Sequence, residues 1–380
     1  MPVWKTSPEP GLESGWDDAA SRREPTICSA FLNALQTSGC VTPDTGWQPL
    51  HLLCEGRAAM PLYAKGHSYG EYVFDQGWAR AAQQAGIRYY PKLLTAVPFT
   101  PAAGPRLLHR EGDTLELAAE AFEVVRSLAE RAGISSWHVL FAQDSEVPAW
   151  KKAGLLHRLG CQYHWFDRDY GDFDGFLATF RQSRRKTVKR ERRLVADQGV
   201  TLEVLEGPQL EPHHWQVFCE CYRATYEKRS GHAGYLNDAF FAAIGRDMPR
   251  DIVMILAAHQ GRHVAAALCL KSADTLYGRY WGALDEFANL HFEACYYQGI
   301  DYCLRTGLRR FDPGAQGEHK IPRGFEPVLT HSFHWLADVR LARAVQDFLK
   351  EERQALRAYA REARDLLPFH REPPAGGEDQ

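Results

Sequence analysis

The sequence lacks the long apolar run that a membrane-spanning helix requires. No stretch of its 380 residues approaches about 18 consecutive apolar residues. The opening stretch, "MPVWKTSPEPGLESGWDD", also has no apolar core of the kind found in secretory signals. We therefore expect no membrane span and no secretory signal. The net charge of −3 is close to neutral, which argues against a general nucleic-acid coat protein.

The sequence is equally poor in metal and disulfide patterns. Its sixteen histidines include no HExxH or comparable ligand set. The nine cysteines are odd in number and scattered, and the nearest pair, Cys219 and Cys221, has neither zinc nor redox spacing. We expect no metal site, and we expect reduced thiols in a cytoplasm. With 45% hydrophobic residues the chain should fold as a globular protein.

The sequence does contain the same order of predicted helices and strands in its two halves. "LLCE-GR-AAMPLY" and "AAHQ-GR-HVAAAL" read as matching hairpins, each preceded by a helix and followed by strand, helix and strand. The clearest helix is capped by Asp113 and ends at Gly133. We expect two copies of one α+β unit, at 25–172 and 199–367, joined by a basic helix at 173–198. Residues 1–24 are predicted to be a disordered tail, and 368–380 a flexible one.

The order within each unit is helices, an antiparallel meander, then a helix crossing to a strand. This is the order of GNAT acyltransferases, in which a V-shaped opening of the sheet admits an acyl donor. Four motifs sharpen the match: "HSYGEYVFD", "YYPKLLTAVPFTPAAGPRLL", "HFEACYYQGIDYC" and "PGAQGEHKIPRGFEP". Together they resemble the Fem-like (FemAB-type) N-acyltransferases, bacterial proteins often described as peptidoglycan biosynthesis/recognition proteins. The resemblance covers roughly 25–367.

This resemblance implies an α+β fold of two tandem GNAT-like subdomains, with mixed, mainly antiparallel sheets flanked by helices. It also implies transfer of an acyl or aminoacyl group to a small-molecule or peptide amine. The co-substrate would be acyl-CoA or aminoacyl-tRNA, with no permanently bound cofactor. One departure concerns the donor. GNAT enzymes that use acyl-CoA usually have an [RQ]-x-x-G-x-[GA] loop at a helix N-terminus. The corresponding "WGALDEFANLHFEA" has no such glycine pattern.

Acyl transfer to an amine needs a proton acceptor, stabilisation of an oxyanion and a proton for the leaving group. In "GAQGEHK", Glu318 or His319 could accept the proton, and Lys320 could hold an anionic group or the oxyanion. Gly314 and Gly317 would let the backbone approach a ligand. The alternative is a polar turn between a strand and the next element.

Two further stretches contain candidate ligand-binding side chains. The first lies just beyond the first hairpin, and it could line the same cavity or form an ordinary sheet edge. The second is the helix that begins near His291, where Glu293 is a candidate catalytic residue but several neighbours fit a core stripe. Arg279, in the preceding strand, could contact a phosphate or carboxylate. The predicted substrate- and donor-binding set comprises His67, Ser68, Tyr69, Glu71, Lys92, Arg279, His291, Tyr297 and Lys320.

The predicted basic helix has eight basic residues between Arg181 and Arg193, against one acid, Glu191. Like charges this dense repel one another, so an anionic partner would relieve the helix. CoA phosphates, tRNA or an acidic acceptor would serve, with Arg185, Lys186, Lys189 and Arg190 as the binding residues. The alternative is a solvated helix face. A non-catalytic pair of GNAT-like units that binds an anionic ligand or RNA here is the competing hypothesis.

Overall fold

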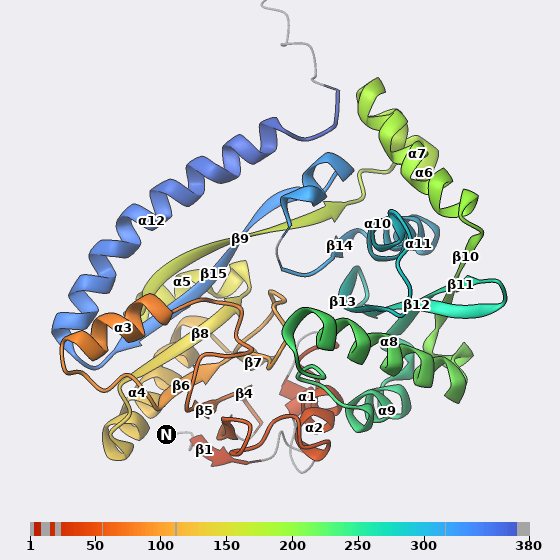
Figure 1. The fold of residues 1–380 in the computed structure, drawn as a ribbon. Coiled ribbons are helices and arrows are strands. Elements are labelled where there is room, and N and C mark those ends of the chain that lie inside the picture. The colour runs from red at the N-terminus through yellow and green to blue at the C-terminus, as the bar shows by residue number, and fades with distance from the viewer. Residues whose placement is uncertain are drawn as a thin grey trace, which may run out of the picture.

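The computed structural model describes residues 4–8, 16–19, 24–54, 56–110, 112–315 and 317–370. Its centre is one large sheet that both halves of the chain build (Figure 1). Within the described residues this sheet has eleven strands, in the order β10-β11-β12-β13-β14-β9-β15-β8-β6-β5-β2. Their bounds are β2 (Trp47–Pro49), β5 (Tyr63–Lys65), β6 (Lys92–Thr95), β8 (Ser136–Ala142), β9 (Leu156–Phe166), β10 (Val200–Glu206), β11 (Ile252–His259), β12 (Arg262–Lys271), β13 (Thr275–Ala283), β14 (Arg310–Asp312) and β15 (Glu326–Leu336).

The middle of the sheet shows how the two copies are joined. Each copy has one parallel pair, β6 with β8 and β13 with β14, and all other pairs in the sheet are antiparallel. Strand β15, from the C-terminal copy, lies between β8 and β9 of the N-terminal copy. Strand β9 in turn pairs with β14 of the C-terminal copy. The tandem GNAT-like fold is confirmed, but each copy gives a strand to the other, so no cut in the sequence separates the two sheets.

Helices cover both faces of the sheet. Their bounds are α2 (Ser29–Thr37), α3 (Gln76–Gln84), α4 (Thr114–Ala132), α5 (Val147–Lys152), α6 (Phe173–Ala178), α7 (Gln182–Asp197), α8 (Pro212–Ser230), α9 (Asp238–Asp247), α10 (Leu290–Phe292), α11 (Gln298–Thr306) and α12 (Val339–Asp365). Single turns η1 (Asp144–Glu146), η2 (Gly207–Gln209) and η3 (Pro249–Asp251) connect elements, η4 (Glu293–Tyr297) is a π-helical turn and η5 (Glu318–Arg323) is a 3₁₀ helix. Helix α12 runs along β9 and β15 on the outside (Figure 1).

The two halves share a hydrophobic core. Helices α2 and α9 pack together, with Phe31 and Phe240 in an edge-to-face contact at 5.5 Å, and both belong to a buried cluster that includes Met254 and Leu268. The chain therefore folds as one body rather than as two loosely linked units. None of the described helices is long and apolar enough to cross a membrane.

Local sequence signals explain several elements. Asp113 caps α4, because its side chain accepts a hydrogen bond from the Leu115 N–H at 2.8 Å, and Gly133 ends the helix at φ 62°. Gln260 and Gly261 both have positive φ (50° and 74°) in the turn between β11 and β12. This is the backbone that a two-residue hairpin requires.

The predicted tails need correction where the structure describes them. Strand β1 (Trp4–Ser7) pairs with β3 (His51–Cys54), in a small sheet with β4 (Ala58–Met60) and β7 (Leu108–His109). In helix α1 (Trp16–Ala19), Trp16 is buried and donates its indole N–H to the Ile27 carbonyl at 2.9 Å. The prediction of a disordered tail rested on the Pro- and Ser-rich composition and overlooked Trp4 and Trp16, which pack in or against the hydrophobic core. The rest of 1–24, and 371–380, lie outside the described residues.

The predicted basic helix is also two helices. The chain breaks at 179–181 between α6 and α7. There the Arg181 N–H donates to the Pro368 carbonyl at 2.8 Å, and the His370 N–H donates to the Thr179 carbonyl at 2.8 Å. Residues 368–370 therefore bind the junction of the two helices instead of forming a free tail.

Candidate functional site

A cavity opens where β13 and β14 part. The two strands pair in parallel only from Thr275 to Tyr277 and from Arg310 to Asp312. Strand β13 then continues to Ala283, whereas the segment that follows β14 turns away from it at Pro313 and Gly314. Gly278 allows this close approach, because a Cβ there would lie 3.3 Å from Pro313 Cα. The cavity has a volume of about 970 Å³, which is enough for a drug-sized ligand.

Three successive residues of β13 line the cavity: Arg279, Tyr280 and Trp281. Tyr280 belongs to the buried cluster on one face of the sheet, and Trp281 packs against the cluster on the other face, so the cavity at this edge reaches both faces. The pairing with β12 shifts register here: Leu268 lies opposite Tyr280 and Cys269 opposite Gly278, which leaves Arg279 as a bulge.

A hydrogen-bonded tyrosine–histidine pair lies in the cavity wall. Tyr296 Oη and His319 Nε2 are 2.7 Å apart, and both residues line the cavity. Burial lowers the pKa of His319 below its usual range, and Lys320 and Arg323 lower it further. Burial raises the pKa of Tyr296. At neutral pH the pair therefore holds a neutral imidazole next to a protonated phenol, which is a proton acceptor beside a proton donor.

A buried ionic network supports the opening from behind. Arg279 donates to Asp312 Oδ2 at 2.7 Å, and His164 Nε2 lies 3.6 Å from Asp312 Oδ1. Burial raises the pKa of Asp312, but the charge of Arg279 and the Gly314 N–H outweigh burial and lower it to about 2. Lys320 donates to the Gly314 carbonyl at 2.6 Å, and burial lowers its pKa to about 8. These contacts fix the loop that follows β14.

Two thiols, Cys269 and Cys295, also line the cavity. Burial raises the pKa of Cys269 to about 12 and raises that of Cys295 well above the usual range for a thiol. Both therefore stay protonated at neutral pH and are poor nucleophiles. The side chains in the cavity favour direct attack by an external amine over a covalent intermediate on cysteine.

The structure divides the predicted site residues into two groups. Arg279, His291, His319 and Lys320 line the cavity, whereas the other residues of the predicted catalytic and binding sets do not. Glu318 is exposed and accepts a hydrogen bond from Tyr359 of α12 at 2.6 Å. Neighbouring residues of a 3₁₀ helix point about 120° apart. Because η5 is such a helix, Glu318 points toward α12, whereas His319, which is also exposed to solvent, points to the cavity.

Glu293 and Tyr297 lie outside the cavity and connect α7 to it. Arg192 of α7 donates to Glu293 at 2.9 Å. Glu191 accepts from Tyr297 and, at 2.7 Å, from Arg323, which in turn donates to the His319 carbonyl at 2.6 Å. The inner face of α7 thus holds the backbone of His319, so Glu293 and Tyr297 are buried structural contacts.

The predicted binding stretch after the first hairpin forms a separate cluster. Lys92 is fully buried and donates to Glu71 at 2.8 Å, to Asp75 at 2.5 Å and to Ser68 at 2.8 Å. Neither this cluster nor His67 and Tyr69 line the cavity. The predicted residues of this stretch therefore do not share a cavity with His319. Tyr72, which follows them in the sequence, does line the cavity.

The opening of the N-terminal copy, between β6 and β8, is closed. Gly104 forms a parallel bridge with Ala142, and its backbone N–H and carbonyl pair with Phe141 and Gln143. Arg106 fills the space behind them; it is buried and donates to the carbonyls of Leu140 at 2.7 Å and Ala102 at 2.6 Å. The cavity therefore belongs to the C-terminal copy.

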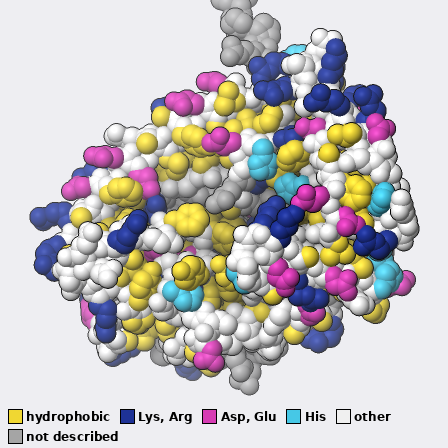
Figure 2. All heavy atoms as spheres, viewed as in Figure 1, with side chains coloured by type: hydrophobic (Ala, Val, Ile, Leu, Met, Phe, Trp, Pro, Cys, Tyr) yellow, Lys and Arg dark blue, Asp and Glu magenta, His cyan; other side chains and the backbone are white. Residues whose placement is uncertain are grey.

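The predicted anion-binding residues lie on the outer side of α7, away from the cavity. Lys186, Lys189 and Arg190 are exposed and Arg185 is half-buried; Lys189 pairs with Asp174 at 2.9 Å. Basic side chains gather over this helix at the upper right of the molecule in Figure 2. Among the described residues, no group of three or more His, Cys, Asp or Glu side chains could hold a metal ion.

Comparison with known proteins agrees with this fold. A family model described as FemAB-like, peptidoglycan biosynthesis/recognition, matches residues 12–371. The chain belongs to the FemAB-like family. No curated protein matches it in sequence.

Several solved structures share the fold at low sequence identity. FemX is 12% identical, with a TM-score of 0.52, over 86% of this chain and 95% of that one. L-PGS from Bacillus licheniformis is 9% identical, with a TM-score of 0.51, over 87% and 98%. The C-terminal domain of a candidate lysylphosphatidylglycerol synthetase from Agrobacterium fabrum is 13% identical, with a TM-score of 0.52, over 84% and 91%.

Sequence reasoning missed the part of the cavity wall that several distant segments build together. Tyr72 and Phe99 come from the N-terminal copy, and Tyr226, Arg229 and Tyr235 come from α8 and the loop after it. Their local signals are those of ordinary core or helix-end residues. An available hint was the cluster of tyrosines between Tyr222 and Tyr235, which is dense for a partly exposed helix.

Proposed function

We propose that this protein is an N-acyltransferase that moves an acyl or aminoacyl group to an amine in the cavity beside β13. The observation that carries the proposal is the Tyr296–His319 pair in the wall of an opening between two parallel strands. The FemAB-like family membership supports the same class of reaction and a substrate related to peptidoglycan.

The donor would lie along the free edge of β13. Beyond Tyr277 this edge has no strand partner, because β14 pairs only with Thr275–Tyr277. Unpaired backbone N–H and C=O groups bind extended ligands much as a neighbouring strand would. The same N–H groups can stabilise the oxyanion that forms when the amine attacks the carbonyl carbon.

Proton transfer would use the tyrosine–histidine pair. The ammonium of the acceptor first loses one proton to solvent to become the free amine, and the neutral His319 accepts the second proton as the amine attacks the carbonyl carbon, directly or through one water molecule. The Tyr296 phenol donates a proton to the leaving group as the bond between carbonyl carbon and leaving group breaks. The hydrogen bond between the two side chains lets the imidazolium return that proton to the phenol, so one turnover leaves the pair as it began.

Reduced thiols fit a cytoplasmic location. None of the nine cysteines forms a disulfide in the described structure, and most are buried. Free cysteines in such number are typical of a reducing compartment.

The donor is tested by native purification followed by mass spectrometry of the retained ligand, and by transfer assays with a panel of acyl-CoAs and aminoacyl-tRNAs. We expect one donor class to support transfer, and we expect the Tyr296→Phe, His319→Ala double variant to lose it. Unchanged turnover in this double variant would exclude the proposed site.

A second function, binding of an anionic ligand or RNA, is favoured by the outer face of α7. Arg184, Arg185, Lys186 and Arg190 have no ion-pair partner among the described residues. RNA binding there should weaken steeply with salt and should fall when Arg185, Lys186, Lys189 and Arg190 are changed to Gln. A binding isotherm that does not respond to salt would count against it.

A further inference from the structure

Basic side chains line the cavity, and the acid that balances one of them, Asp312, lies outside it. Arg229, Arg279 and Lys320 line it together with His291 and His319, and no Asp or Glu is among its described lining residues. An ammonium group gains nothing from such a wall, and a polyamine would be repelled by it. The acceptor must therefore be recognised through some feature other than its amine.

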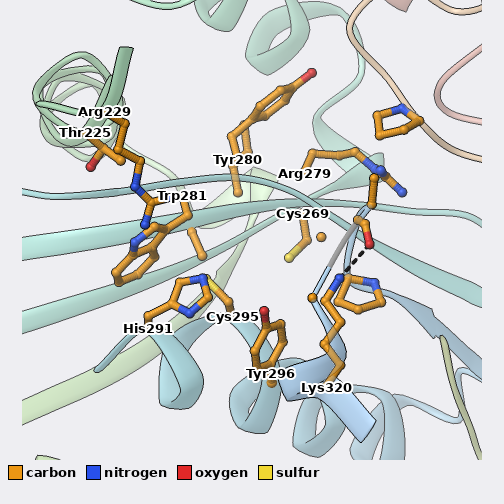
Figure 3. Close-up of a pocket in the computed structure, with 18 of the residues that line it drawn as sticks. Thr225, Arg229, Cys269, Arg279, Tyr280, Trp281, His291, Cys295, Tyr296 and Lys320 are labelled. Carbon is orange, nitrogen blue, oxygen red and sulfur yellow. Dashed lines mark hydrogen bonds between the residues drawn. The ribbon is translucent and has the colours of Figure 1, made fainter. Parts of the chain in front are cut away.

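Of the three cations, Arg229 is the one whose charge is not already used. Arg279 pairs with Asp312, and Lys320 donates to the Gly314 carbonyl. Arg229 has no described hydrogen bond or ion pair, and Figure 3 shows it reaching from α8 toward Trp281 and His291. Burial, His319 and the charge of Arg229 together lower the pKa of His291 to about 4, which agrees with a guanidinium directed into the cavity.

Arg279 adds a second, buried sign of a missing ligand. Its side chain is only 2% exposed, yet its Nε–H has no hydrogen-bond partner in the structure. A buried donor without a partner is costly, and such groups are usually satisfied by a ligand or water. Arg229, at the exposed side of the cavity wall, and Arg279, at its buried side, thus both have N–H groups without a hydrogen-bond acceptor among the described residues.

An aromatic wall faces the same space. Phe99 and Tyr235 stack at 4.9 Å with an interplanar angle of 12°, and Tyr72 and Tyr226 line the cavity with them. Tyr72 and Phe99 have positive φ (60° and 57°), which is rare for bulky side chains and clusters at ligand sites. The wall offers flat apolar surface and phenol groups beside Arg229.

We propose that the acceptor is an amine whose molecule also carries a carboxylate or phosphate, held by Arg229, and an apolar or aromatic body that packs on this wall. The inference rests on the proposed function, since it names the acceptor class of the same cavity. It excludes simple amines and polyamines as good substrates.

The anion site and the base are separate groups in the cavity wall. The His291 and His319 ring centroids are 6.3 Å apart, and Arg229 reaches toward His291 from α8 (Figure 3). A dipeptide, whose two extended residues span roughly 7 Å, is therefore a suitable probe.

The test measures binding by calorimetry to the Tyr296→Phe protein, which removes turnover from the readout. The probes are phenylalanyl-alanine, its C-terminal amide, tyramine and tyramine O-phosphate. We expect the dipeptide acid or the phosphate to bind about tenfold more tightly than the amide and tyramine, the effect of one charge-assisted hydrogen bond. Comparison of the two anionic probes distinguishes carboxylate from phosphate.

The matched variants are Arg229→Met and Arg246→Met. Arg246 is exposed on α9, where it pairs with Asp247, so its loss should leave binding unchanged. Arg229→Met should remove the preference for the anionic probes. Equal binding of acid and amide, absence of binding by both anionic probes, or an Arg229→Met effect on donor KM alone would each overturn the inference. Failure of the proposed function would appear separately, as transfer that survives in the Tyr296 and His319 double variant.

Discussion

The parallel strand pairs of the two copies have the same place in the fold, but the pair in the N-terminal copy is closed and the pair in the C-terminal copy is open. Between β6 and β8 the chain is closed by the Gly104 bridge and the buried Arg106. Between β13 and β14 pairing stops at Asp312, and a cavity of about 970 Å³ follows. A duplicated fold therefore has one candidate site, and the closed copy contributes Tyr72 and Phe99 to its wall.

The largest expected effect is on transfer in the open copy. Tyr296→Phe combined with His319→Ala should lower kcat/KM about 10²- to 10⁴-fold, the usual contribution of positioned proton donors and acceptors. His67→Ala, in the closed copy, should change kcat/KM less than twofold because His67 does not line the cavity. Steady-state kinetics on both variants check this; a comparable loss in His67→Ala would remove the distinction between the copies.

Each copy also has a buried cation whose loss would leave a buried carboxylate without its partner. Lys92→Met leaves Glu71 and Asp75 buried without it, and Arg279→Met leaves Asp312 in the same state. Each change should lower the free energy of unfolding by about 3–5 kcal/mol, as found when one partner of a buried pair is removed. Urea unfolding measures this, with Lys350→Met, an exposed residue, as control within about 0.5 kcal/mol. Folded Lys92→Met should keep its transfer activity, whereas Arg279→Met should not.

The closure of the N-terminal copy is tested by Arg106→Ala. The change removes the hydrogen bonds to the Leu140 and Ala102 carbonyls and leaves both acceptors buried. We expect the free energy of unfolding to fall by about 2–4 kcal/mol. Transfer by the folded protein should not change, because Arg106 lies away from the cavity. If the variant instead bound two ligand molecules per chain, the opening between β6 and β8 would be a second binding site that Arg106 normally fills.

The pH dependence of kcat/KM should show two limbs. His319 must be neutral to accept a proton, and because its pKa is lowered, activity should rise with pH in a range below 6.5. Lys320, with its pKa lowered to about 8, loses its charge above that pH, so its hold on Gly314 weakens and activity should fall. In Lys320→Arg the alkaline limb should move to higher pH. A limb that stays in place would assign it to another group.

The smallest effect is expected at Glu318. Glu318→Ala removes one exposed hydrogen bond from Tyr359, so stability should change by no more than about 1 kcal/mol and kcat/KM less than twofold. His319→Ala, one residue along, is the paired comparison. A large loss of transfer in Glu318→Ala alone would mean that the loop changes conformation during catalysis and brings Glu318 into the cavity.

The sequence allowed the fold to be predicted well, because periodicity and turn residues are local signals. The hairpin at Gln260 and Gly261 and the caps of α4 are as expected. The site was predicted in part. Arg279, His291, His319 and Lys320 line the cavity, but Glu293 and Tyr297 do not, because η4 is a π-helical turn that changes which residues share a face.

By itself, the sequence determined the duplicated α+β units, the polar loop after β14 and the residue types available there for proton transfer. Only the tertiary structure decided which copy is open, which of Glu318 and His319 faces the cavity, and that β9 and β15 change places between the sheets. The physical reason is distance along the chain. A cap or turn depends on neighbours a few residues away, whereas an open or closed strand pair depends on how segments far apart in the sequence, such as those of Arg106 and Leu140, fill the same space.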